Sequence, residues 1–122
     1  MAYDTDNIFA RILRGEIPCN RVYEDDWALA FHDIRPQAPV HVLVIPKGPY
    51  VTLEDFTTQA TTEEIAGFWR AVGTVARDLG LSADGYRFLA NNGRHAHQEV
   101  MHLHVHLFGG CDLGGMIKRG LV

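Results

Sequence analysis

A chain of 122 residues with 47% hydrophobic and 21% charged side chains is long enough to bury a core and too apolar to remain disordered. We therefore expect one globular domain over residues 1–122. A formal net charge of −4 argues against sequence-independent binding of nucleic acid, which depends on a basic surface.

Cysteine content and hydropathy indicate the compartment in which the protein is expected. Cys19 and Cys111 form neither a metal-binding spacing nor a disulfide framework, so we interpret them as free thiols in a reducing compartment. The chain does not open on a basic stretch followed by an apolar core, and no apolar run approaches the ~20 residues of a membrane span. The expected location is the cytoplasm, with no membrane partner.

The N-terminal part of the chain predicts a short helix and a hairpin. The first residues, Met1 to Thr5, are expected to be a loose end. Asp6 or Asn7 can cap a helix that Gly15 ends. A β-hairpin is expected over residues 21–33, because two apolar runs flank a turn-forming acidic segment.

The middle of the chain predicts a loop, a buried strand and the start of a long helix. Residues 34–39 contain two prolines and are interpreted as a loop. The β-branched run 41–45, which ends at Pro46, is typical of a buried strand. Thr61 and Glu64 have the spacing of a capping box, which marks a helix start.

The last elements follow in the same way. Apolar residues recur with a helical period until Gly80, where the long helix is expected to end. Strands are predicted over residues 86–90 and 101–108, with a turn at residues 91–93 between them. This order of elements predicts an α+β domain with a mostly antiparallel sheet.

The most informative segment is 101–108, in which histidines alternate with apolar residues. Successive side chains of a strand point to opposite faces, so three histidines are predicted to share one face: His102, His104 and His106. The opposite face would carry Met101, Leu103, Val105 and Leu107 into a core. Imidazoles are poor core filler, so the histidine face needs another explanation.

Three explanations are open on the residues alone. The histidines can be solvated surface groups without a role. They can bind zinc, with His95 or His97 as further ligands, although same-face strand positions roughly 7 Å apart lie along a line and do not converge. They can also catalyse, because a neutral imidazole is a nucleophile when a hydrogen bond fixes its tautomer. In that case His104, flanked on both sides, is the candidate nucleophile.

The pattern His102-x-His104-x-His106-Leu-Phe-Gly-Gly resembles the signature of the histidine-triad (HIT) superfamily of nucleotide hydrolases and transferases. Segments across nearly the whole chain are similar to its Hint branch. They are Asn7-Ile-Phe9, Gly15-Glu-Ile-Pro18, Glu24-Asp-Asp26, Ala30-Phe-His-Asp-Ile34, Pro36-Gln-Ala-Pro-Val-His41, Val44-Ile-Pro-Lys47, Asn91-Asn-Gly93 and Gln98-Glu-Val100.

The resemblance implies a five-stranded antiparallel sheet with two helices, and a homodimer in which two copies continue the sheet. It implies hydrolysis of purine nucleoside phosphoramidates of the adenosine 5′-phosphoramidate type, with neither a cofactor nor a metal ion. His104 matches the nucleophile that forms a covalent nucleotidyl-histidine, and His106 matches the group that contacts the phosphate and protonates the leaving amine. His102 and His41 match supporting histidines.

The resemblance also assigns a nucleotide site. Asp33 matches the carboxylate that accepts the ribose hydroxyls, and Ile34 beside it is expected to pack on the base. Further candidates for the base slot are Phe9, Ile12 and Ile17. Candidates around the phosphate are Asn91, His97, Gln98 and Glu99, which would offer amide, imidazole and backbone donors.

Two departures from the Hint pattern leave alternatives open. Ala96-His97 stands where this branch is commonly glycine-rich, so His97 can add a donor or narrow the pocket. Glu99 would repel a phosphate unless it is protonated or turned toward a histidine, which suggests an orienting or acid–base role. Two functions other than phosphoramidate hydrolysis are also open. One is a dinucleoside polyphosphate hydrolase with the same triad, and the other is a regulatory nucleotide-binding protein with incidental turnover.

Overall fold

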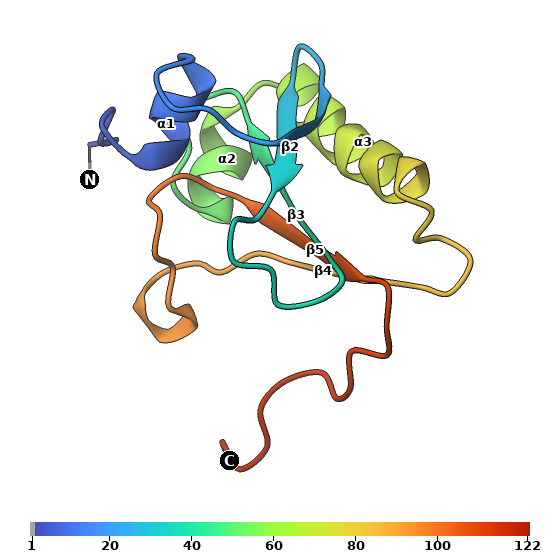
Figure 1. Cartoon of the computed structure of the whole chain (residues 1–122). Coiled ribbons are helices and arrows are strands. Elements are labelled where there is room, and N and C mark those ends of the chain that lie inside the picture. Colours follow the sequence, from blue (N-terminus) through green and yellow to red (C-terminus); the bar gives the residue numbers. More distant parts are fainter. Residues whose placement is uncertain (1) are drawn as a thin grey trace.

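The computed structural model describes residues 2–122, and within them the chain forms three α-helices, one 3₁₀-helix and a five-stranded antiparallel sheet (Figure 1). The helices are α1 (Ile8–Leu13), α2 (Leu53–Gln59), α3 (Thr62–Asp78) and η1 (Arg94–Ala96). The strands are β1 (Arg21–Glu24), β2 (Ala28–His32), β3 (Val40–Pro46), β4 (Arg87–Leu89) and β5 (Val105–Gly109), in the spatial order β1-β2-β3-β5-β4. The α+β class and the five-stranded sheet are confirmed. None of the helices in the described residues is long and apolar enough to cross a membrane.

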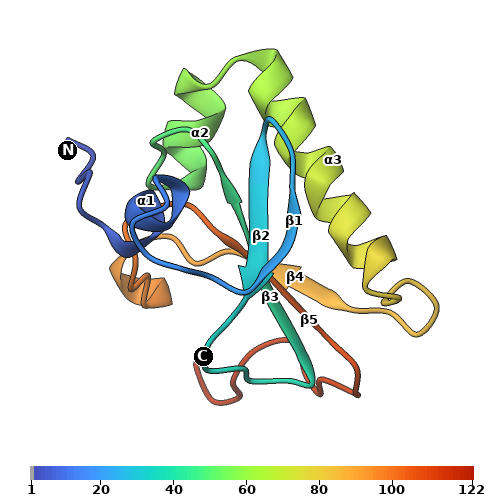
Figure 2. The same cartoon turned by 45° about the horizontal axis from the view of Figure 1, so that its top comes forward.

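The alternation of side chains along β3 and β5 assigns each sheet face its own core. One face packs against α2 and α3, through residues such as Val42 and Leu107. The opposite face packs against α1, through Leu43 and Phe9 among others. In Figure 2, α1 lies on the left of the strands and α3 on their right. His106 lies opposite Leu43 in the β3–β5 register, so it belongs to the α1 face.

Helix caps explain where the helices begin. The Asn7 side chain accepts hydrogen bonds from the first turn of α1, and Thr61 with Glu64 forms the predicted capping box of α3. The sequence prediction missed α2, so the expectation of two helices is wrong. Its start carries a second capping box, Thr52 with Asp55, in which Asp replaces the usual Glu or Gln.

The prediction of a strand over residues 101–108 is wrong at its start, because β5 begins only at Val105. The β3–β5 ladder ends at the Val44–Val105 pair, just before Pro46, which has no N–H to donate. Upstream of Val105, the Leu103 N–H donates instead to the Tyr50 carbonyl at 2.7 Å. Met101, which was expected on the core face, is therefore exposed.

The prediction of a loose N-terminal end is also wrong within the described residues. The Asn7 amide donates to the Asp4 carbonyl at 2.8 Å, and the Arg14 guanidinium donates to the Thr5 carbonyl at 2.6 Å. These bonds fold the segment before α1 back onto the helix. Met1 lies outside the described residues.

Candidate active site

A cavity of about 400 Å³ lies between the loop joining β2 and β3, the segment that contains η1, and β5. In Figure 1 the first loop is teal and η1 is orange. The cavity wall consists of Asp33, Arg35, Gln37, Asn91, Ala96, His97, Gln98, Glu99, His104 and His106. Residues far apart in the sequence thus meet at one site, and most of the predicted phosphate-binding residues are among them.

His41 and His106 form a hydrogen-bonded pair at the base of this site. The backbone N–H of Gln37 donates to His41 Nδ1 at 3.1 Å, so this nitrogen carries the lone pair. The proton of neutral His41 is therefore on Nε2, which lies 2.9 Å from His106 Nδ1 and donates to it. Since His106 Nδ1 accepts, the proton of neutral His106 is on its Nε2. The pair thus makes His106 a proton donor.

His104 has the opposite tautomer. Its Nδ1 lies 2.7 Å from the His102 carbonyl oxygen, which can only accept, so Nδ1 carries the proton. Nε2 of neutral His104 consequently carries the lone pair. The rings of His104 and His106 are 5.1 Å apart between centroids. The cavity wall therefore combines an imidazole with a free lone pair on Nε2 and an imidazole with a proton on Nε2.

Of the three histidines predicted to share one face, only His104 and His106 line the cavity. His102 does not line it, although it packs against Phe9 of α1 as His104 does. His102 is fully buried, and its Nε2–H donates to the Pro46 carbonyl at 2.8 Å. Its Nδ1 accepts from the Tyr3 hydroxyl at 2.5 Å. Its backbone carbonyl accepts the hydrogen bond from His104 Nδ1–H.

Burial keeps these imidazoles neutral. Desolvation lowers the pKa of His102 and of His106 to about 4, and the positive charge that neighbouring histidines would carry acts in the same direction. Desolvation also lowers the pKa of His104 and His41, against an opposing effect of the Asp33 carboxylate. At neutral pH each ring therefore has one donor and one acceptor nitrogen, as the tautomers above require.

Asp33, His41 and His106 place one potential metal ligand atom each within 4.8 Å of one another. Ligation through His41 Nε2 would move the ring proton to Nδ1, where it would face the Gln37 N–H. Two donors would then point at each other. The hydrogen bonds thus fit a proton-donating pair better than a metal-ligand set.

Gln98 lines the cavity, but its amide is fully engaged. Its Oε1 accepts from the Gly93 N–H at 2.9 Å, and its Nε2 donates to the carbonyls of Val51 and Val100 at 2.8 and 3.2 Å. Gln98 therefore holds its own loop together and ties it to Val51, which precedes α2. The adjacent His97 is, among the described residues, the only non-glycine with a positive φ, at 57°. This left-handed conformation costs backbone energy, and it occurs in the cavity wall.

The predicted nucleoside residues occupy different positions. Asp33 lines the cavity, and its Oδ2 lies 3.4 Å from His41 Nε2. Ile34 is 89% exposed and does not line the cavity, so its contact with a base stays a prediction. Phe9 packs edge-on against His104, with centroids 4.9 Å apart. Ile12 and Ile17 are half-buried and do not line the cavity either.

Three contributions were missed by the sequence analysis. Arg35 and Gln37 line the cavity from the loop after β2, and Gln37 sets the tautomer of His41. The only sequence signal was their position in the loop 34–39, which contains two prolines and precedes the candidate His41. The third is Tyr3, which contacts a residue 99 positions away and carried no signal at all.

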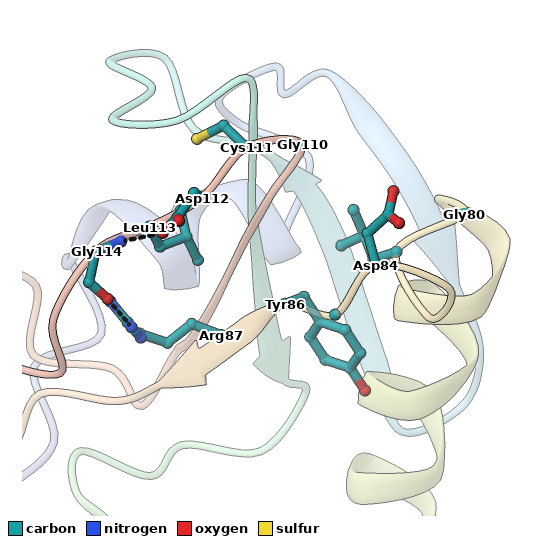
Figure 3. Close-up of a pocket in the computed structure, with 11 residues that line it drawn as sticks. Gly80, Asp84, Tyr86, Arg87, Gly110, Cys111, Asp112, Leu113 and Gly114 are labelled. Atoms are coloured by element: carbon teal, nitrogen blue, oxygen red, sulfur yellow. Dashed lines mark hydrogen bonds between the residues drawn. The ribbon is translucent and has the colours of Figure 1, made fainter.

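A second cavity, of about 600 Å³, lies between the end of α3, the start of β4 and the segment after β5 (Figure 3). Asp84, Tyr86 and Cys111 are among its lining residues, and no histidine is. The Arg87 guanidinium donates to the Gly114 carbonyl at 3.1 Å, which ties the C-terminal segment to β4. Because His104, His106 and the Asp33 carboxylate meet in the other cavity, we take that one as the candidate active site.

The sheet, the paired histidines and the buried third histidine define a histidine-triad domain. The HIT domain family matches residues 14–113, and the chain belongs to this family.

Relatives are similar over almost their whole length. The chain is 62% identical to a 13.2 kDa HIT-like protein of Azospirillum brasilense, over 97% of both chains. It is 44% identical to the purine nucleoside phosphoramidase of Escherichia coli K12, over 93% of this chain and 95% of that one.

Solved structures agree with the fold. A histidine triad protein from Clostridium difficile superposes with a TM-score of 0.84 at 37% identity, over 95% of this chain and all of that chain. A HIT family hydrolase from Legionella pneumophila superposes with a TM-score of 0.81 at 42% identity, over 88% and 95%.

Proposed function

We propose that the protein is a hydrolase that cleaves the P–N bond of purine nucleoside phosphoramidates, of the adenosine 5′-phosphoramidate type. The observation that carries this proposal is the complementary pair of tautomers, with a lone pair on His104 Nε2 and a proton on His106 Nε2. The similarity to a purine nucleoside phosphoramidase supports the choice of substrate class.

The proposed chemistry has two steps. His104 Nε2 attacks the phosphorus, the P–N bond breaks, and the amine leaves with the proton of His106 Nε2. The negative charge left on the ring of His106, to which His41 Nε2–H donates, balances the positive charge that the ring of His104 gains. A water molecule then cleaves the nucleotidyl-histidine, returns a proton to His106 and releases the nucleotide. His104 Nδ1–H stays bonded to the His102 carbonyl throughout, which stabilises the positive charge that the attacking ring gains.

The proposed nucleotide orientation follows from the charges of the wall. The Asp33 carboxylate accepts from the ribose hydroxyls, while Asn91 and Arg35 supply donors for the phosphate. Phe9 forms an apolar wall behind the nucleophile and holds its ring edge-on. Glu99 raises the pKa of His104 through its negative charge, which fits an orienting role near the nucleophile.

The proposal is tested by intact-protein mass spectrometry after rapid mixing with adenosine 5′-phosphoramidate. Wild-type protein should gain one adenylyl mass transiently and release AMP, whereas His104→Ala should do neither while still binding AMP. Turnover without an adduct, or turnover by His104→Ala, would contradict covalent catalysis at His104. AMP binding without turnover would favour a sensor, and turnover of diadenosine tetraphosphate alone would favour the polyphosphate hydrolase.

We also propose a homodimer that extends the sheet at β4 and works in the cytoplasm. β4 is the last strand in the order and pairs only with β5. Its Phe88 side chain is 57% exposed and packs against the partly exposed Trp69 of α3. Phe68, which directly precedes Trp69 in the sequence, is buried in the core. Sedimentation equilibrium of the wild type and Phe88→Glu should give a dimer and a monomer.

A further inference from the structure

Tyr3 contacts the histidine network from outside the cavity. Its hydroxyl lies 2.5 Å from His102 Nδ1, and the two rings meet edge-on with centroids 5.7 Å apart. Since His102 Nε2–H is already donated to the Pro46 carbonyl, Nδ1 has only a lone pair, and the Tyr3 hydroxyl must be the donor. Burial raises the pKa of Tyr3, so the hydroxyl keeps this proton.

The position of Tyr3 is built into the fold. Asp4 and Thr5, which follow it, are tied to Asn7 and Arg14 through their carbonyl groups. The first turn of α1 then places Phe9 edge-on against both His102 and His104, at centroid distances of 6.4 and 4.9 Å. Tyr3 and Phe9 thus contact these histidines without lining the cavity.

We propose that Tyr3 is a positioning residue for the nucleophile: its hydroxyl fixes the ring of His102, whose backbone carbonyl holds the Nδ1–H of His104. The inference rests on the proposed role of His104. With two ring nitrogens bonded to two separate segments, His102 has one tautomer and one ring orientation. Its carbonyl, 2.7 Å from His104 Nδ1, is then held in place as well.

Removal of the hydroxyl has a defined consequence. Every buried side-chain nitrogen and oxygen in residues 2–122 has a hydrogen-bond partner. Without the Tyr3 hydroxyl, His102 Nδ1 becomes a buried acceptor with no partner. A rotation of the ring that relieves it breaks the bond to Pro46 and shifts the backbone that orients His104.

The test compares Tyr3→Phe with Tyr23→Phe. Tyr23 is the matched control, because its hydroxyl donates to Asp25 at 2.9 Å and contacts no histidine. For each protein we would measure kcat and KM with adenosine 5′-phosphoramidate, and the imidazole ¹⁵N shifts by NMR. Tyr3→Phe should lower kcat on the order of tenfold and change KM by less than about twofold. The ¹⁵N shifts of His102 should move away from those of a single Nε2–H tautomer, while Tyr23→Phe should match the wild type in all three quantities.

Two outcomes overturn the proposal. The first is a Tyr3→Phe protein with wild-type kcat and wild-type His102 shifts. The second is a lower kcat with unchanged His102 shifts, which would reflect lost packing at the N-terminus and not positioning. Failure of the proposed function is distinct, because it would appear as an inactive wild type or an active His104→Ala. The ¹⁵N shifts of Tyr3→Phe would still decide whether Tyr3 fixes His102.

Discussion

His41 Nε2 lies 2.9 Å from His106 Nδ1, and the Gln37 N–H on the far side of the His41 ring gives this hydrogen bond its direction. A residue on β3 thereby decides which nitrogen of a residue on β5 carries the proton. The Gln37 N–H thus fixes the tautomer of His41, and His41 in turn fixes the tautomer of His106 in the cavity wall.

The first prediction concerns His41. His41→Ala removes the donor to His106 Nδ1, so His106 can hold its proton on either nitrogen and protonates the leaving group less often. We expect kcat to fall roughly 10- to 100-fold with a smaller change in KM. Steady-state kinetics checks this, with His32→Ala as the control because His32 is an exposed residue at the end of β2. Equal kcat values for the two variants would contradict the prediction that His41 fixes the position of the proton on His106.

The second prediction concerns Asp33, whose carboxylate is proposed to accept from the ribose hydroxyls. Asp33→Asn should weaken AMP binding on the order of tenfold, because a charged acceptor is replaced by a neutral one. Calorimetric titration with AMP and with 2′-deoxy-AMP checks the assignment. Wild-type protein should discriminate between the two ligands, and Asp33→Asn should bind both alike. Unchanged discrimination in the variant would place the ribose elsewhere.

Much of the fold could be predicted from local patterns. Asn7 and Thr61 cap helices as expected. Val42 is in the core, as the β-branched run 41–45 predicts, and Leu107 is in the core, as the alternation in 101–108 predicts. The start of β5 could not be predicted, because the alternation of histidines continues upstream of Val105 where the ladder has already ended. The alternation of residue types is the same whether or not a neighbouring strand is there to form hydrogen bonds.

The candidate site also has parts that could be predicted and parts that could not. The spacing of His102, His104 and His106 indicated chemistry, the resemblance to the family implied Asp33, and the structure brings His104, His106 and Asp33 into one cavity. The contacts that set their tautomers could not be found, because they come from the Gln37 backbone N–H and from Tyr3. Such contacts exist only once distant segments are folded together.

The third prediction concerns acid stability. Burial lowers the pKa of His102 from 6.5 to about 4, so between these values the unfolded chain binds a proton that the native protein does not. The free energy of unfolding therefore decreases as the pH falls through this window, by about 1.4 kcal/mol per pH unit for this residue. Above pH 6.5, the ordinary pKa of the imidazole, the contribution of His102 is constant.

Urea unfolding of the wild type and His102→Gln over this pH range checks the sign and the size. The slope of the unfolding free energy against pH should be smaller in His102→Gln by about 1.4 kcal/mol per pH unit, which corresponds to one proton. Glu24 and Glu64, whose pKa values are lowered by their hydrogen-bond partners, do not obscure the comparison, because both proteins contain them and their contributions cancel. Parallel slopes for the two proteins would mean that His102 is protonated in the native state as readily as in the unfolded chain.

The fourth prediction concerns Gln98, whose side chain makes three hydrogen bonds to the segments around Gly93, Val51 and Val100. Gln98→Ala removes three partly buried hydrogen bonds, so we expect a loss of roughly 2–4 kcal/mol in the free energy of unfolding. Urea unfolding measures this loss, with Gln59→Ala as the control because Gln59 is an exposed residue at the end of α2. Since Gln98 also joins the η1 segment to the rest of the wall, AMP affinity should fall in Gln98→Ala and not in Gln59→Ala. If Gln98→Ala is as stable as the control but binds AMP more weakly, the amide contacts the phosphate directly, and its hydrogen bonds to the wall are dispensable.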